Sequence, residues 1–207
     1  RVLFRSFDHV SYRYHNAEKP ALTDVDFSAK SGQTVAIIGG TGSGKSTLIN
    51  LIPRFYDLEK GQIKIDGIDI TQLAPEKLRD AVSLVPQKAT LFTGTLRENM
   101  KYGKSDATDD EIWHALEIAR ARQFVEDDPA GLDMFVEQGG GNFSGGQRQR
   151  LAIARALVKQ SAIYIFDDSF TALDFKTDAD LRAELRQDAH IQKSITVIVA
   201  QRIATVA

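Results

Sequence analysis

The sequence predicts an α/β fold with a parallel sheet, and three observations lead to this prediction. Four short apolar runs have the length of strands buried on both faces, at 34–38, 81–85, 162–166 and 195–200. Segments with helical spacing of apolar residues lie among these runs. The composition is globular, with 43% hydrophobic and 26% charged residues among 207. Buried strands that alternate with helices form parallel sheets.

The other expected elements are a strand-rich beginning and several helices. Residues 2–14 and 22–29 alternate loosely between apolar and polar, with turn residues between them, so we expect antiparallel strands there. Another short strand is expected over 62–66. The expected helices are 47–55, 109–120, 147–158 and 178–187.

The pattern becomes helical and more polar in the middle of the chain, and no internal repeat is present. We therefore expect a single domain, 1–207, in which a helical subdomain of 88–158 is inserted into a core of 1–87 and 159–207. Glycine is concentrated in two places, with four of 15 glycines in 39–44 and five in 139–146. Such clusters indicate close approach of the backbone to something else.

Composition excludes several classes of protein. A formal net charge of −2 argues against nucleic acid as the main partner, because that partner requires a basic surface. The absence of cysteine excludes disulfides, thiolate metal sites and thiol nucleophiles, and it fits a reducing cytosolic compartment. The longest apolar runs reach about a third of the roughly 20 residues that a membrane span needs, and no signal peptide opens the chain. The polypeptide itself is therefore expected to be soluble.

A glycine-rich loop after the first buried run carries the strongest chemical signal. Residues 39–47 satisfy the pattern G-x-x-x-x-G-K-[ST] between a predicted strand and a predicted helix. Its backbone N–H groups can face one centre, and the helix N-terminus adds partial positive charge. In such a loop Lys45 reaches the β- and γ-phosphates, and the Ser46 hydroxyl coordinates Mg²⁺. The expected phosphate site comprises Gly39, Gly40, Thr41, Gly42, Ser43, Gly44, Lys45, Ser46 and Thr47.

Two carboxylates follow the apolar run at 162–166. Ligands of parallel sheets bind at the carboxyl ends of the strands, which is where Asp167 and Asp168 are expected. Asp167 fits the Mg²⁺-associated carboxylate that accompanies a phosphate loop. Asp168 could polarise an attacking water. Alone, acidic residues could simply end a strand; beside the phosphate loop they predict a catalytic edge.

The segment Phe143-Ser144-Gly145-Gly146-Gln147 narrows the field further, because most phosphate-loop proteins lack it. The chain resembles the nucleotide-binding domain of ABC transporters from about Phe4 to its last residue, and only Phe143 departs from the family's signature Leu-Ser-Gly-Gly-Gln. The signature opens a predicted helix 99 positions after Lys45, so its N–H groups make a second anion site. The resemblance implies a P-loop NTPase (RecA-like) core, an antiparallel β subdomain and an inserted α-helical subdomain. It also implies that Ser144, Gly145, Gly146 and Gln147 bind the γ-phosphate of ATP held by a facing subunit.

Two further positions match motifs that contact the nucleotide. Tyr14 resembles the aromatic residue that stacks on adenine. Tyr12 lies on the same strand face, and either tyrosine could instead belong to the core. Gln87 resembles the Q-loop glutamine, which contacts Mg²⁺ and the attacking water and links to the transmembrane half.

Three other segments match motifs that act between domains. Thr171-Ala172-Leu173-Asp174 resembles the D-loop, which crosses the dimer interface. Glu137 resembles the X-loop residue of exporters, although its surroundings match loosely. The run 91–99 is typical of exporters and favours export over import.

Two departures from the family pattern fall in one composite site. The family normally has a catalytic glutamate where this chain has Asp168, and a histidine where it has Gln201. The shorter carboxylate lies further from the attacking water, and Gln201 can donate a hydrogen bond but cannot carry an imidazolium charge. The sequence therefore suggests a degenerate site that binds ATP and Mg²⁺ but hydrolyses ATP slowly, as in one half of a heterodimeric exporter. A working homodimer that tolerates both residues is the alternative.

The resemblance implies a second nucleotide-binding domain, more in keeping with a heterodimer than a homodimer, and a transmembrane domain in the same subunit. It places the motor at the cytoplasmic face of a cell membrane and suggests that this chain is trimmed, its C-terminus included. Rival readings are a DNA-repair ATPase, a translation-factor ATPase and a regulatory nucleotide-binding module. The 99 positions between Lys45 and Ser144 leave no room for the long coiled coil of the first, and one copy of the motifs speaks against the second.

Overall fold

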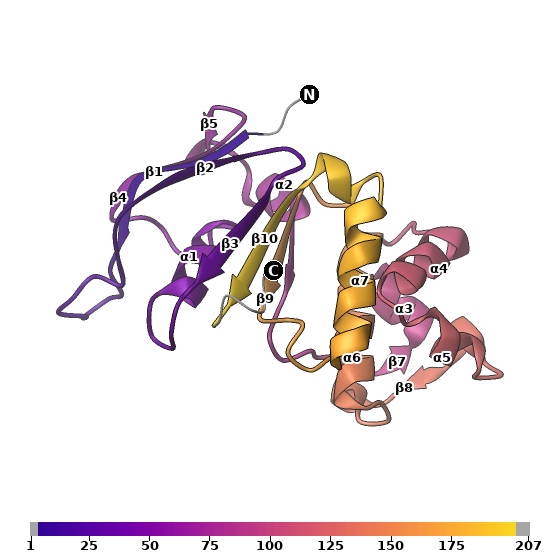
Figure 1. Ribbon diagram of the computed structural model, residues 1–207. Coiled ribbons are helices and arrows are strands. Elements are labelled where there is room, and N and C mark those ends of the chain that lie inside the picture. Colours follow the sequence, from indigo (N-terminus) through magenta and orange to yellow (C-terminus); the bar gives the residue numbers. More distant parts are fainter. Residues whose placement is uncertain (1–3, 202–207) are drawn as a thin grey trace. The chain divides into compact units, whose positions relative to one another are not determined.

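The computed structural model describes residues 4–201 (Figure 1). Contacts divide the chain into two compact units. The first contains Arg1–Ser83, Ala162–Asp167 and Gln192–Ala207, and the second contains Leu84–Ser161 and Asp168–Ile191. No helix in the described range 4–201 is long and apolar enough to span a bilayer.

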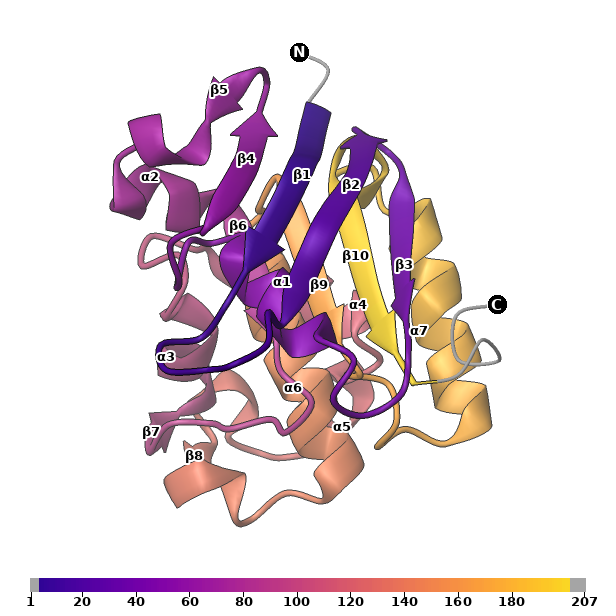
Figure 2. The same ribbon diagram turned by 90° about the vertical axis from the view of Figure 1, so that its left-hand side faces the viewer.

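An antiparallel sheet of four strands forms one part of the first unit (Figure 2). Its order is β2-β1-β4-β5. The strands are β1 (Phe4–Tyr12), β2 (Leu22–Lys30), β4 (Lys60–Ile65) and β5 (Ile68–Asp69). Phe7 lies opposite Phe27 in this sheet, and their rings stack with centroids 4.6 Å apart. The predicted antiparallel pair at the start of the chain is confirmed within the described residues.

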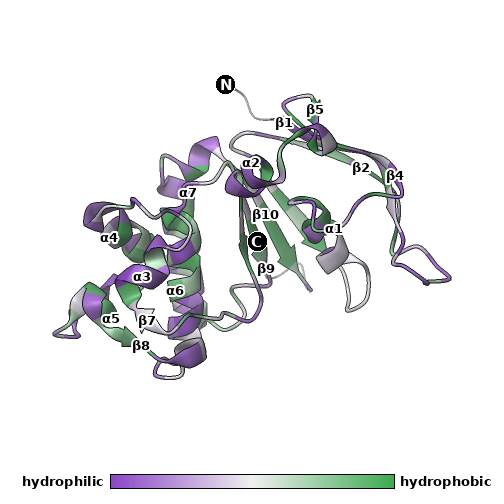
Figure 3. Cartoon of the chain, turned by 180° about the vertical axis from the view of Figure 1, so that it is seen from behind, coloured by the Kyte–Doolittle hydropathy of each residue, from purple (hydrophilic) through white to green (hydrophobic). Residues whose placement is uncertain are grey.

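A parallel sheet carries the chemistry-bearing loops. Its order is β3-β10-β9-β6, and its strands are β3 (Thr34–Ile38), β6 (Val82–Val85), β9 (Ile163–Asp167) and β10 (Ile195–Ala200). Val199 pairs with Ile37 on one side and with Asp167 on the other, so three strands end at the same edge. Figure 3 shows the apolar character of β9 and β10, which explains why their sequence is a continuous apolar run.

The second unit is mainly helical. Its helices are α3 (Leu96–Lys101), α4 (Asp109–Ile118), α5 (Arg122–Glu126), α6 (Gly145–Val158) and α7 (Phe175–Gln187). A two-stranded ladder of β7 (Gly94–Thr95) and β8 (Phe135–Val136) lies among them. The apolar face of α6 is buried, including Leu151, Ile153 and Leu157.

The grouping of α7 differs from the sequence expectation, which assigned all residues after 158 to the core. Contacts place α7 in the helical unit instead. Leu181 and Leu185 of α7 are buried, and ion pairs with α4 and the residues after it accompany this packing: His114 lies 3.0 Å from Asp188, and Arg120 lies 3.7–3.8 Å from Asp180 and Glu184. The spacing of apolar residues in the sequence does not reveal such ion pairs.

The helix expected over 47–55 was wrong at both ends. The observed helix α1 (Lys45–Leu51) begins within the phosphate loop and stops earlier. Beyond Ile52 the chain turns, and Arg54 adopts a left-handed φ of 57° that no α-helix contains. A short helix α2 (Pro75–Asp80) was not expected, and it begins with proline at its first position.

Candidate functional site

The phosphate loop leaves the end of β3, where the Gly39 N–H donates to the Ala200 carbonyl at 3.3 Å. Gly44 has a left-handed φ of 91°, and a Cβ there would lie 2.8 Å from the Ala21 carbonyl oxygen. A Cβ on Gly39 would lie 2.6 Å from Ser43 Oγ. Gly44 therefore requires glycine for the compact turn that exposes the backbone N–H groups, whereas the close atom at Gly39 belongs to a serine side chain that can turn away.

Lys45 bends back over its own loop. Its Nζ donates to the Gly40 carbonyl at 2.7 Å and to Ser43 Oγ at 3.3 Å. The side chain of Ser46 is exposed in the first turn of α1, whereas Thr47 is buried. The loop thus presents a cation and a hydroxyl from adjacent residues, as phosphate and Mg²⁺ binding requires.

The structure separates the two tyrosines that the sequence left as alternatives. Tyr12 is buried, at 8% exposure, whereas Tyr14 is 40% exposed. The Tyr14 hydroxyl lies 2.7 Å from Thr47 Oγ1, which attaches this ring to the phosphate-loop helix. Tyr12 and Tyr56 support it edge-on, with ring centroids 5.0 and 5.7 Å from that of Tyr14. Tyr14 is therefore the accessible tyrosine of the pair, and Tyr12 is a core residue.

The acidic edge lies where the sequence expected it. Asp167 is the last residue of β9 and Gln201 directly follows β10. Since β10 separates β9 from β3, the backbones of Asp167 and Ile38 are about 10 Å apart, two strand spacings. Gln201 is exposed at the same edge. The Arg202 that follows it lies outside the described residues.

Asp168 and Gln87 contact each other within the second unit. Gln87 Nε2 donates to the Asp168 carboxylate at 3.2 Å. Asp168 has a left-handed φ of 49°, so the chain turns sharply directly after β9. Ser169 Oγ then donates to the Val85 carbonyl at 2.7 Å. This turn fixes the Asp168 carboxylate beside the glutamine.

The signature segment forms a capped helix start. Ser144 Oγ accepts from the Gln147 N–H at 3.1 Å, and the Gln147 side chain accepts from the Ser144 N–H at 3.0 Å. This capping box engages two donors and leaves the Gly145 and Gly146 N–H groups at the first positions of α6. A Cβ on Gly146 would lie 3.3 Å from the Ala172 carbonyl oxygen, so the expected D-loop packs against the signature.

One residue of this site was missed by the sequence analysis. Gln149 is only 2% exposed, and its Nε2 donates to the Pro86 carbonyl at 3.2 Å, next to Gln87. It lies on α6 one turn before Ile153, on the apolar face. The sequence signal that pointed to Gln149 was a single amide side chain on the apolar face of the predicted helix.

The remaining motif residues have structural partners. The Glu137 N–H donates to the Asn142 side chain at 3.1 Å, in a short turn before the signature. Within the run 91–99, Thr95 and Glu98 form a capping box that starts α3. Arg97 binds Asp133 at 3.0 Å, and this bond lowers the pKa of the Asp133 carboxyl.

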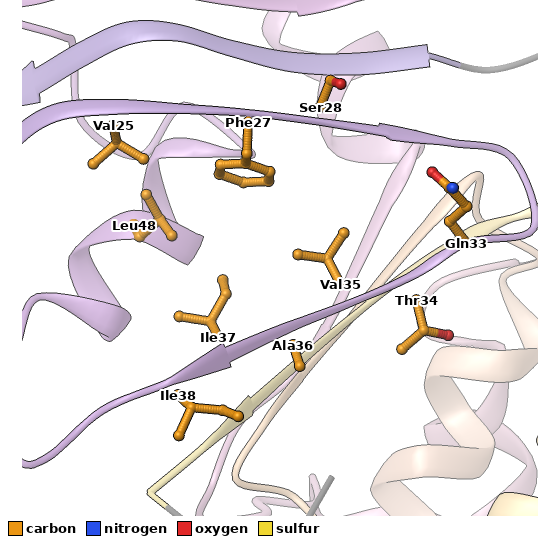
Figure 4. A pocket seen from close by; sticks show the side chains of 10 residues that line it. All are labelled: Val25, Phe27, Ser28, Gln33, Thr34, Val35, Ala36, Ile37, Ile38 and Leu48. Atoms are coloured by element: carbon orange, nitrogen blue, oxygen red, sulfur yellow. The ribbon is translucent and has the colours of Figure 1, made fainter. Parts of the chain in front are cut away.

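An open groove of about 700 Å³ in the first unit does not coincide with this chemistry (Figure 4). Its lining is mainly apolar, with Phe27 from β2, Val35 and Ile37 from β3, and Leu48 from α1. No residue of 39–47 lines it.

The two units hold the expected site residues separately. The phosphate loop, Tyr14, Asp167 and Gln201 belong to the first unit, and Gln87, Asp168 and the signature belong to the second.

A phosphate loop on a parallel sheet, an acidic strand end and a capped Ser-Gly-Gly-Gln helix define an ATPase domain of the ABC class. Residues 22–171 match the family model described as "ABC transporter", and the chain belongs to that family. It is therefore an ATP-binding domain.

Known proteins similar to this chain are much longer. An uncharacterized ABC transporter ATP-binding protein of Mycobacterium tuberculosis is 49% identical over 203 residues, covering 95% of this chain and 34% of that protein. The ATP-dependent lipid A-core flippase of Chromobacterium violaceum is 40% identical over 201 residues, covering 97% and 34%. A solved structure of a bacterial Atm1-family ABC exporter with ATP bound has a TM-score of 0.93 and 37% identity, covering all of this chain and 36% of that one. The chain thus spans about a third of the length of these relatives.

Proposed function

We propose that this chain is the ATP-driven motor domain of a membrane exporter and acts at the cytoplasmic face of the membrane. The similarity to a flippase and to an Atm1-family exporter supports export rather than import. The exporter's transported substrate would bind in a transmembrane domain of the same subunit. In this proposal Tyr14 stacks on the adenine, and residues 39–47 hold the phosphates through backbone N–H groups and Lys45.

The oxygen donors of the chain suit Mg²⁺. This ion prefers hydroxyl, carboxylate and carbonyl oxygen and keeps several of its waters. Ser46 and Asp167 of the first unit supply a hydroxyl and a carboxylate. When bound, Mg²⁺ would neutralise charge on the β- and γ-phosphates.

The site is completed by a second nucleotide-binding domain. The signature presents two backbone N–H groups and the Ser144 hydroxyl at the start of a 14-residue helix, which suits a phosphate carried by another domain. Two such domains would face each other head to tail, and each signature would cover the nucleotide on the partner's loop. ATP would then join the domains, and hydrolysis would release them.

The hydrolytic step is where this chain differs from its family. Asp168 would take a proton from the attacking water, and Gln201 would donate a hydrogen bond to the γ-phosphate. An aspartate reaches one methylene less far than a glutamate, and its carboxylate already accepts a hydrogen bond from Gln87. Misplacement of a catalytic group by about 1 Å costs roughly 100-fold in rate. We therefore assign ATP binding without rapid hydrolysis to this site, with a partner of different sequence carrying the faster site.

The test restores the family's residues in the full-length subunit assembled with its partner. The double variant Asp168→Glu, Gln201→His should raise hydrolysis at this site by at least 10-fold while ATP affinity changes little. Lys45→Ala in the same background is the control, and it should abolish both ATP binding and the gain. If turnover does not rise, the result would instead favour a working homodimer in which Asp168 already acts as the base. The contact of Asp168 with Gln87 is the observation that supports this alternative.

A further inference from the structure

Side chains hold the loop between β6 and β7. The described residues 86–93 form no helix or strand, so their carbonyl groups need partners from other parts of the chain. Two such partners come from α6, the helix that the signature opens. Gln149 Nε2 donates to the Pro86 carbonyl at 3.2 Å, and Arg155 Nη2 donates to the Thr90 carbonyl at 3.0 Å. The loop is therefore attached to α6 at two points.

The amide of Gln149 is unusual for its place in the helix. The residue is only 2% exposed, and it shares the buried face of α6 with apolar side chains such as Ile153. A buried amide costs free energy unless it is hydrogen bonded, so an apolar residue would serve the packing of this face at least as well. The amide is therefore explained by the carbonyl that it holds and not by packing.

The residue before Pro86 is held by the turn that carries Asp168. Ser169 is fully buried, and its Oγ donates to the Val85 carbonyl at 2.7 Å. Two consecutive carbonyls thus accept hydrogen bonds from side chains of different segments. Gln87 follows them directly, and its Nε2 donates to the Asp168 carboxylate at 3.2 Å. The place of Gln87 beside Asp168 is therefore set by hydrogen bonds to the two residues before it.

We propose that Gln149 is a positioning residue for ATP hydrolysis: it ties the loop of Gln87 to α6 and so holds Gln87 beside Asp168. This inference rests on the proposed function, because it assumes that Asp168 acts on the attacking water. It gives α6 two tasks, since the helix presents the signature N–H groups at its start and holds the loop from its second turn. A shift of α6 when the signature binds a phosphate would therefore carry Gln87 with it.

A double-mutant cycle in the full-length assembled transporter tests this role. It uses the Asp168→Glu, Gln201→His background, or the unaltered transporter should that pair bring no gain in turnover. Gln149→Met keeps the length of the side chain and removes the donor, so turnover at saturating ATP should fall about 5-fold, which corresponds to one ordinary hydrogen bond. The ATP concentration for half-maximal rate should stay within about 2-fold, because Lys45 and Tyr14, which hold ATP in the proposed function, belong to the first unit.

The cycle separates positioning from general destabilisation of α6. If Gln149 acts through Gln87, Gln149→Met should lower turnover no further once Gln87→Ala is present, whereas the losses should multiply if the two residues act independently. Gln149→Leu, which also lacks a donor, should behave in the same way and is the second variant for the cycle. Ile153→Val removes one methyl group from the same buried face and is the matched control, and its turnover should stay within about 2-fold of the parent.

The outcomes distinguish this inference from the proposed function. Lys45→Ala should abolish turnover, and unchanged turnover in that variant would overturn the proposed function together with the positioning role. If Lys45→Ala is inactive but Gln149→Met and Gln149→Leu keep full turnover, the positioning role is overturned and the proposed function stands. The same holds if Gln87→Ala has no effect, or if the losses from Gln149→Met and Gln87→Ala multiply.

Discussion

Arg5 gives the sharpest prediction about stability. This residue of β1 is only 3% exposed, and its guanidinium makes one hydrogen bond, from Nη2 to the Ile52 carbonyl at 2.8 Å beyond the end of α1. Nε and Nη1 have no partner among the described residues. Burial lowers the pKa of Arg5 to about 9. A charged group is thus held in an apolar site with most of its donors unsatisfied.

The expected effect of Arg5→Met follows from these values. Burying a charged group whose donors are mostly unsatisfied costs several kcal/mol, and the substitution gives up one hydrogen bond from a charged group, which contributes about 1.5–3 kcal/mol. Arg5→Met should therefore raise the free energy of unfolding at pH 7 by about 2 kcal/mol. Because the pKa of Arg5 is lower in the folded state, the unfolded state binds more protons than the folded state above pH 9. The free energy of unfolding of the wild type should therefore rise between pH 9 and about 12 because of Arg5, and that of Arg5→Met should lack this rise.

Urea unfolding followed by circular dichroism measures this difference. Arg13→Met, which removes an exposed arginine 3.6 Å from Glu59, is the control and should change stability by less than about 0.5 kcal/mol. Destabilisation of Arg5→Met by 1 kcal/mol or more would refute the reasoning. It would mean that the hydrogen bond to Ile52 outweighs the cost of burying the charge.

Three further predictions concern the nucleotide site and the first sheet. Tyr14→Ala should weaken ATP binding by about 10-fold or more through lost stacking while inorganic triphosphate binding stays unchanged, as calorimetry would show; equal losses for both ligands would contradict base stacking. Gly44→Ala should destabilise the domain by at least 1 kcal/mol more than Gly67→Ala, because both have positive φ but only Gly44 has a carbonyl 2.8 Å from the added Cβ; equal melting shifts would remove that explanation. The hydrogen bond with Asp24 raises the pKa of His9 in the folded state, so the stabilisation from this pair is full below about pH 6.5 and is lost as the pH rises through the raised pKa. His9→Gln should therefore reduce the pH dependence of the free energy of unfolding, measured by urea titration at several pH values. An unaltered pH dependence would exclude a contribution from the pair.

The sequence predicted the parts of this fold that follow from local chemistry. Continuous apolar runs located all four parallel strands, and Lys45 with its glycines identified the phosphate loop. Ser144 identified a helix start, and the capping box with Gln147 is present. In each case the residues that make the sequence pattern also make the local structure, so the pattern is enough to predict that structure.

Other features depend on contacts between residues far apart in the chain. The assignment of α7 to the helical unit follows from its contacts with elements such as α4, which lies far earlier in the chain. The left-handed backbone of Asp168 is not encoded by an aspartate, which adopts this conformation only occasionally. Tyr12 and Tyr14 share a strand pattern, and they are distinguished by their burial and by the hydrogen bond of Tyr14 to Thr47.

The most direct test of the account is the identity of the nucleotide held at this site during turnover. The full-length transporter would be given excess radiolabelled ATP and Mg²⁺, separated rapidly from free nucleotide and quenched, and the retained ATP and ADP would be counted for each dimer. If Asp168 and Gln201 make a slow site, about one nucleotide per dimer should be retained as ATP, and Asp168→Glu, Gln201→His should convert it to ADP. Retention of ADP alone by the unaltered transporter would contradict the central claim.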